Sequence, residues 1–78
     1  MTETYVGTIL GAYLQGSIVC LEIRQDGTNQ VVTEYGDTRP TCDSLLAAFG
    51  PHPLAGKRLH VHRENGLMTG FRPIRGGA

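Results

Sequence analysis

Three short segments, each ending in glycine, constrain the fold of this chain more than any other feature. Each segment interrupts a run of alternating apolar residues. The three segments are Leu14-Gln15-Gly16, Gln25-Asp26-Gly27 and Glu64-Asn65-Gly66. A three-residue hairpin loop places glycine where the backbone needs a positive φ angle. The sequence therefore predicts three β-hairpins, which in so short a chain favour a small curled sheet or barrel.

The apolar runs between these segments predict five strands. Alternation indicates strands over residues 5–14, 17–24 and 30–35, and two further strands flank the last glycine segment, the fourth of them beginning at Lys57. Glycines inside the long first strand permit the bending that a closed or curled sheet requires.

A helix is predicted between the third and fourth strands. Its apolar residues follow the spacing i, i+3, i+4 and i+7, which places them on one face. These residues are Cys42, Leu45, Leu46 and Phe49. Thr41, or Thr38 one turn earlier, is expected to cap the helix, and Gly50 followed by Pro51 is expected to end it.

The element order β-β-β-α-β-β predicts a mainly β (small α+β) protein built as a five-stranded antiparallel β-barrel or rolled sheet. This order is similar to that of OB-type barrels, whose helix also lies between strands three and four. An SH3-like barrel is the alternative. Residues 1–75 are expected to form a single small β-barrel domain, and residues 76–78 a flexible tail.

Successive side chains of a strand point to opposite faces of the sheet, and the length of a hairpin loop decides which of them face the core. We call this assignment of side chains to faces the parity of a strand. A three-residue loop in the second hairpin places Leu21 opposite Val31, whereas a two-residue loop brings Glu34 onto the buried face. The first register is preferred because it keeps charge out of the core. A three-residue loop in the last hairpin places Leu59 opposite Phe71. The expected inward set is Ile9, Val19, Leu21, Ile23, Val31, Leu59, Val61 and Phe71.

The opposite parity leaves an outer face that is unusually apolar. It comprises Val6, Leu10, Leu14, Ile18, Cys20 and Val32. A solvated sheet face alternates into polar residues instead. Either the helix covers this face or a second subunit does, since contiguous exposed apolar area is typical of interfaces. The second explanation predicts a homo-oligomer.

The outward side chains of the last hairpin form a candidate ligand-binding site. The outward side chains are Arg58, His60, His62, Met68 and Arg72, and the candidate site consists of the four basic ones. Arg58 is expected to face Arg72, and Gly70 to face His60. Guanidinium and imidazole groups bind phosphates and carboxylates through charge-assisted hydrogen bonds. An opposing glycine leaves room for a ligand above the imidazole. These four residues therefore predict an anion-binding surface.

The sequence does not favour a metal site or a catalytic site. His60 and His62 lie on one strand face, which suits zinc only if a third ligand joins them, and none is evident in the sequence. No nucleophile elbow or nucleotide-binding fingerprint occurs in the chain. We predict no cofactor and favour binding over catalysis.

The charge distribution and the two cysteines indicate which partners and which cellular compartment suit this chain. Residues 1–50 hold two bases and six acids, whereas residues 51–78 hold five bases and one acid. The halves therefore carry net charges of −4 and +4, and attract each other or their counterparts in another subunit. Two cysteines without framework spacing, no apparent signal peptide and no membrane span predict a cytoplasmic protein.

These features together predict a small oligomeric binding module that uses the basic C-terminal hairpin. Its partner is an acidic protein, a nucleic acid or a small anion. The alternatives are a nucleic-acid-binding OB-like protein and a small enzyme whose site lies between subunits, because one such chain encloses a substrate poorly.

Overall fold

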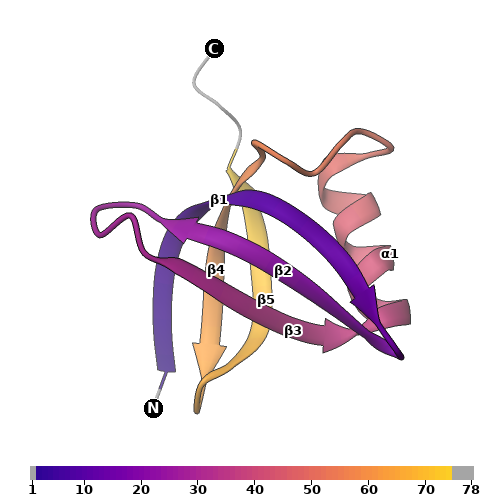
Figure 1. Cartoon of the computed structure of the whole chain (residues 1–78), viewed down its shortest axis with the longest axis horizontal. Helices are drawn as coiled ribbons and strands as arrows, with labels where there is room; N and C mark the ends of the chain where they lie inside the picture. The colour runs from indigo at the N-terminus through magenta and orange to yellow at the C-terminus, as the bar shows by residue number, and fades with distance from the viewer. Residues whose placement is uncertain (1, 75–78) are drawn as a thin grey trace.

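The chain folds into one antiparallel sheet of five strands with a single helix after the third strand (Figure 1). The computed structural model describes residues 2–74, so the predicted tail at 76–78 lies outside the described residues. The elements are β1 (Thr2–Gln15), β2 (Ile18–Gln25), β3 (Val31–Asp37), α1 (Thr38–Phe49), β4 (Arg58–Glu64) and β5 (Leu67–Ile74). The predicted order of elements is confirmed. No helix within the described part of the chain is long and apolar enough to cross a membrane.

The sheet curls strongly, with the strand order β3-β2-β1-β4-β5. The long strand β1 makes the curl possible, because its residues 2–8 pair with β4 and its residues 7–15 pair with β2. A bulge between Ile9 and Gly11 interrupts the ladder with β2. Strands β3 and β5 contact each other, but the hydrogen-bonded ladder is not closed between them in the described residues. The structure therefore confirms a curled mainly β fold and not a closed barrel.

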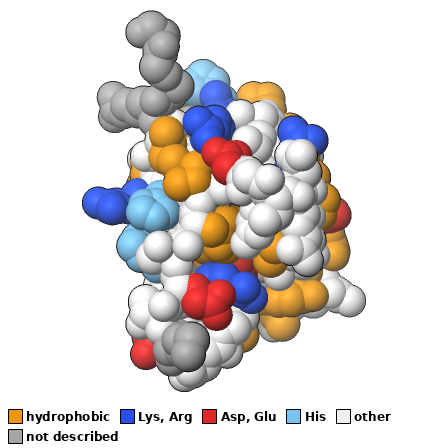
Figure 2. All heavy atoms as spheres, turned by 90° about the vertical axis from the view of Figure 1, so that its left-hand side faces the viewer, with side chains coloured by type: hydrophobic (Ala, Val, Ile, Leu, Met, Phe, Trp, Pro, Cys, Tyr) orange, Lys and Arg blue, Asp and Glu red, His pale blue; other side chains and the backbone are white. Residues whose placement is uncertain are grey.

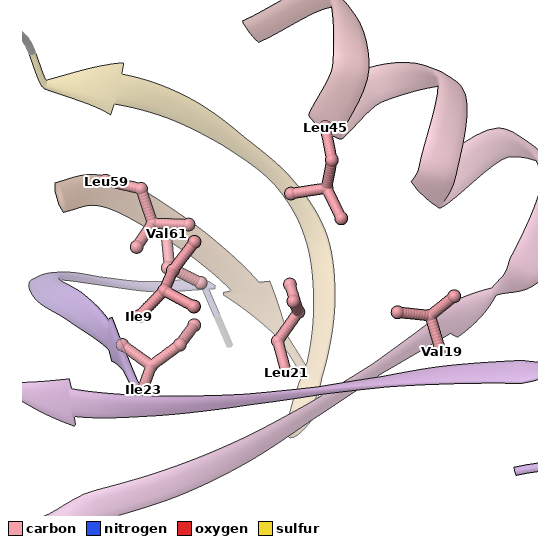
Figure 3. Close-up of a cluster of buried hydrophobic side chains, with 7 residues drawn as sticks. All are labelled: Ile9, Val19, Leu21, Ile23, Leu45, Leu59 and Val61. Carbon is pink, nitrogen blue, oxygen red and sulfur yellow. The ribbon is translucent and has the colours of Figure 1, made fainter. Parts of the chain in front are cut away.

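The core fills the concave side of the curled sheet (Figure 3). Side chains from four elements meet there with almost no solvent exposure. The buried hydrophobic cluster comprises Ile9, Val19, Leu21, Ile23, Leu45, Leu59 and Val61. Fully burying such side chains contributes about 1.5–3 kcal/mol each, so this cluster is the main source of stability.

Helix α1 begins one turn earlier than the favoured cap residue Thr41 implies. Asp37 occupies the N-cap position, and Thr38 is the first helical residue, so neither threonine caps the helix and no side-chain cap bond forms. Pro40 is tolerated in the first turn because the amide hydrogen it lacks has no helical partner there. Gly50, with a φ angle of 72°, ends the helix as predicted.

The helix covers one end of the core and leaves the outer face of the sheet uncovered. Leu45 is buried in the core, and Phe49 is half-buried with its ring 6.3 Å from that of Phe71. Cys42 and Leu46 lie on the predicted apolar stripe but are exposed. The helix therefore does not account for the apolar outer face, which leaves the question of what covers it.

The register between β2 and β3 differs from the expected one. Leu21 faces Glu34 rather than Val31. The loop is longer than three residues, because the backbone N–H of Gln25 donates to the carbonyl of Gln30 at 2.8 Å. The expected parity of β3 is therefore wrong, and Glu34 lies inside with 1% exposure.

The register between β4 and β5 also differs from the expected one, but it differs by an even number of residues. Its turn consists of the two residues Asn65 and Gly66, both with positive φ angles, rather than three. A bulge then adds one residue to β5, so that Phe71 faces Val61 instead of Leu59. Because the bulge restores the parity, the four predicted site residues remain on the outer face. Met68 lies before the bulge, pairs with Arg63 and packs against the core, so its expected outward position is wrong.

Two members of the expected apolar outer set are placed elsewhere. The first turn is Gly16-Ser17, and beyond the bulge in β1 Leu14 pairs with the inward residue Val19. Val32 pairs with the core residue Ile23. The bulge in β1 moves Leu14, and the longer β2–β3 loop moves Val32, to the concave side of the sheet.

Candidate anion-binding site

The alternation of β4 separates its side chains into an inner and an outer set. Leu59 and Val61 are fully buried in the core. The intervening His60 and the following His62 therefore project from the outer face, where both are partly exposed. Their ring centroids lie 5.0 Å apart with a tilt of 35° between the ring planes.

Strand β5 brings an arginine to the same place. Arg72 pairs with His60, and Gly70 pairs with His62. We call the set His60, His62 and Arg72 the His–Arg strip. Figure 2 shows histidine side chains grouped with a basic side chain along one side of the molecule. The strip therefore joins three predicted site residues on one face of one hairpin.

The surroundings of the strip leave it accessible. A Cβ atom built at Gly70 meets no heavy atom within 4 Å. On the other side, β1 places Thr4 opposite His62 and Val6 opposite His60. No charged side chain of β1 opposes the two imidazoles, so an incoming anion meets open space above the ring of His62.

Arg58 lies on the same face but is engaged elsewhere. Its guanidinium donates a hydrogen bond to the carboxylate of Asp26 in the loop between β2 and β3. Arg58 pairs with Ile74, so the expected contact between Arg58 and Arg72 is wrong. The shorter turn and the extra residue in β5 together shift the partners by two positions and remove that like-charge pair.

Arg72 keeps its charge uncompensated within the described residues. Neither of the two ion pairs formed among residues 2–74 involves it. The next acid on this face of β4 is Glu64, two positions beyond His62. One guanidinium and two imidazoles can thus present several N–H donors to a single anion.

The two histidines do not by themselves make a metal site. No group of three or more histidine, cysteine or acidic residues suited to a metal ion occurs within residues 2–74. A structural zinc ion takes four protein ligands and a catalytic one three. The geometry therefore supports hydrogen bonding by His60 and His62 rather than coordination.

Sequence reasoning missed a buried polar cluster on the inner side of the same hairpin. Glu34 accepts a hydrogen bond of 2.5 Å from the hydroxyl of Tyr5. The Nε atom of Arg63 lies 3.1 Å from the same carboxylate oxygen. Burial first, and then the bond to Glu34, raise the pKa of Tyr5 above its ordinary value. The presence of an arginine of inward parity on β4 was the signal that could have shown that Glu34 is compensated.

A groove of about 220 Å³ lies between α1 and β5. Thr41 and Ser44 line it from the helix, and Gly70 and Phe71 line it from β5. Gly70 therefore borders both this groove and the His–Arg strip. Asp37 at the end of β3 lines the groove as well.

Comparison of the chain with protein-family models, with curated proteins and with solved structures finds no match. Its function must therefore be inferred from the chemistry of its own residues.

Proposed function

We propose that this protein is a small oligomeric binding module that holds an anionic group at the His–Arg strip. One observation carries this proposal: Arg72 pairs with His60, beside His62, on a face where Gly70 leaves open space. Three donor side chains converge there without an acid among their direct strand partners. Such an arrangement leaves an exposed guanidinium and neighbouring N–H donors available to a ligand of opposite charge.

The chemistry of the strip indicates a carboxylate or phosphate ligand. A guanidinium binds either group through two parallel N–H bonds, and the imidazoles add further donors. Because Arg72 is exposed, salt screens the attraction, and affinity should fall as ionic strength rises. The groove beyond Gly70 gives the remainder of the ligand a place to lie.

The architecture and the environment form part of the same proposal. The curled five-stranded sheet, with its helix between β3 and β4, supports an OB-like fold over an SH3-like one. Both cysteines, Cys20 and Cys42, are free thiols. Free thiols are typical of reducing compartments, which supports a cytoplasmic location.

Nucleic-acid binding is the second candidate. Tyr13 and Tyr35 are about half exposed on the outer face of the sheet, and exposed aromatic rings are stacking platforms for unpaired bases. However, Glu22 and Asp37 lie on the same face and repel phosphates. Simple anion or carboxylate binding therefore ranks first. The alternative of a small enzyme with its site between subunits stays a prediction.

Calorimetric titration tests the proposal with three probes: pyrophosphate, a hexaglutamate peptide and a single-stranded DNA hexamer. We expect saturable binding of at least one probe and a loss of roughly tenfold or more in affinity for Arg72→Gln, about 1.4 kcal/mol. Arg39→Gln is the matched control, because Arg39 is exposed on α1 away from the strip. Equal binding by the two variants would contradict the proposal.

A further inference from the structure

The outer face of β1, β2 and β3 carries an apolar patch that α1 does not cover. Tyr13 pairs with Cys20, and Cys20 pairs with Tyr35, so the three side chains form one row across the strands. Ile18 lies next to Cys20 on the same face of β2. We call Tyr13, Ile18 and Tyr35 the tyrosine patch; their exposed fractions are 48%, 41% and 50%, above a fully buried Cys20.

Two carboxylates accompany the tyrosine patch. Asp37 pairs with Ile18, and Glu22 follows Cys20 at the next outward position of β2. Neither acid forms an ion pair within residues 2–74. A hydrogen bond with Cys20 raises the pKa of Tyr13, and the negative charge of Glu22 adds to the shift. The patch is therefore apolar at its centre and negative beside it.

The opposite charges of the two chain halves are only partly neutralised inside one molecule. Both ion pairs among the described residues join an acid of the first half to a base of the second, Asp26 to Arg58 and Glu34 to Arg63. The remaining unmatched charges include the acids beside the tyrosine patch and Arg72 in the His–Arg strip. No ion pair among residues 2–74 joins these acids to Arg72.

We infer that the anionic group held by the His–Arg strip is supplied by a second copy of this chain, through Glu22 and Asp37 beside its tyrosine patch. This inference rests on the proposed function of the strip. The guanidinium of Arg72 donates to a carboxylate of the other copy, and the imidazoles His60 and His62 add donors. Tyr13, Ile18 and Tyr35 lose their solvent exposure in the same contact, as tyrosine and arginine anchors do in protein interfaces.

The contact joins two different surfaces, so it is heterologous rather than two-fold. Two copies joined in this way leave one free patch on one copy and one free strip on the other, unless the assembly closes into a ring. The assembly is therefore expected to grow with protein concentration and to weaken with salt, since charge pairs at its rim are screened. A two-fold dimer through the tyrosine patch alone would not depend on Arg72.

Sedimentation velocity from 10 µM to 1 mM protein, at low and high salt, measures this association. Arg72→Glu and the double variant Glu22→Lys/Asp37→Lys are each expected to weaken it roughly tenfold or more. Arg39→Glu and Asp43→Lys are matched controls, since both residues are exposed on α1, and they should leave it unchanged. Circular dichroism establishes that each variant is folded.

A charge swap provides the decisive arm. The triple variant Arg72→Glu/Glu22→Lys/Asp37→Lys matches a negative strip to a positive patch within one kind of chain, and it should recover the association that each reversal alone weakens. The control Arg39→Glu/Glu22→Lys/Asp37→Lys keeps a basic strip against a positive patch, and its association should stay weak. Monomers at every concentration, or association unaffected by the reversals, would overturn the inference. If those monomers still bind pyrophosphate or hexaglutamate, the proposed function stands while the second-copy inference fails.

Discussion

Charged side chains on the two faces of the β4–β5 hairpin differ in burial and in whether they form ion pairs. On the inner face, Arg63 lies against Glu34, which also accepts the hydroxyl hydrogen of Tyr5. On the outer face, His60 pairs with Arg72, and no ion pair within residues 2–74 includes either. A charge that is buried and partnered holds the fold together, whereas a charge that is exposed and unpartnered is available to a ligand.

This comparison predicts that inner-face substitutions change stability and that outer-face substitutions change binding. Loss of a buried partner costs several kcal/mol, whereas most surface substitutions change stability by less than about 0.5 kcal/mol. The variants below probe the comparison in order of decreasing expected effect.

Glu34→Ala should cause the largest loss of stability. It leaves Arg63, whose side chain is 21% exposed, without its counter-charge and opens a cavity beside Tyr5. We expect the free energy of unfolding in urea to fall by about 3–5 kcal/mol. Glu64→Ala removes an exposed acid from the same hairpin and should change stability by less than about 0.5 kcal/mol. Similar losses for the two variants would break the comparison.

Tyr5→Phe should have the next largest effect, and the effect should depend on pH. The variant loses the 2.5 Å bond to Glu34, which costs about 1.5–3 kcal/mol near neutral pH because the acceptor is charged. Since the fold raises the pKa of Tyr5, the native chain keeps the phenol proton where the unfolded chain loses it, above about pH 10.

The stabilisation by Tyr5 is therefore complete below that pH and declines as pH rises above it. Urea unfolding of both proteins from pH 8 to pH 11 measures the difference, in which the contributions of the other tyrosines cancel. The difference should narrow above pH 10. A constant difference across the range would show that the Tyr5 proton is not linked to folding.

Two glycines sharpen the comparison between the faces. A Cβ atom at Gly7 would lie 2.5 Å from Cγ2 of Ile23 and 2.7 Å from the carbonyl oxygen of Arg24, whereas a Cβ atom at Gly70 meets nothing within 4 Å. Gly7→Ala should therefore destabilise the fold by about 1–3 kcal/mol, and Gly70→Ala by less than about 0.5 kcal/mol. Thermal unfolding checks both values. Gly70→Leu, which fills the space above His62, should weaken anion binding without a comparable loss of stability.

Asp26→Asn should have the smallest effect. The side chains of Asp26 and Arg58 are 47% and 43% exposed, and exposed ion pairs contribute about 0.2–1 kcal/mol. We expect a loss within that range, which 0.5 M salt should reduce further. A loss as large as that of Glu34→Ala would mean that solvent exposure does not separate the two ion pairs.

The sequence was sufficient to predict the element order and most of the core. Alternating apolar residues around turn glycines led to five strands, and seven of the eight expected inward residues lie on the inner face. The exception is Val31, because the β2–β3 loop is longer than the expected three-residue loop Gln25-Asp26-Gly27. The preferred register kept Glu34 out of the core, but its compensating partners lie 29 residues away in either direction along the chain, on β1 and β4. Pairing over such distances is not visible in local parity.

The candidate site was predicted more accurately in its members than in its contacts. His60, His62 and Arg72 share a face because strand alternation is insensitive to a shift of two residues. The strand partner of each residue depends on the two-residue turn Asn65-Gly66 and on the bulge in β5. The position of Gly66 in the sequence is equally compatible with a three-residue loop, so the sequence did not show these partners. Arg58 forms an ion pair with Asp26, which lies in the distant loop between β2 and β3. No local sequence pattern predicts this ion pair.

The central claim is that the His–Arg strip binds anionic groups. Titration of ¹⁵N-labelled protein with pyrophosphate, followed by amide chemical shifts, tests it residue by residue. We predict saturating shifts that are largest at His60, His62, Gly70 and Arg72 and small along α1. Shifts that do not saturate, or that centre on another surface, would contradict the claim.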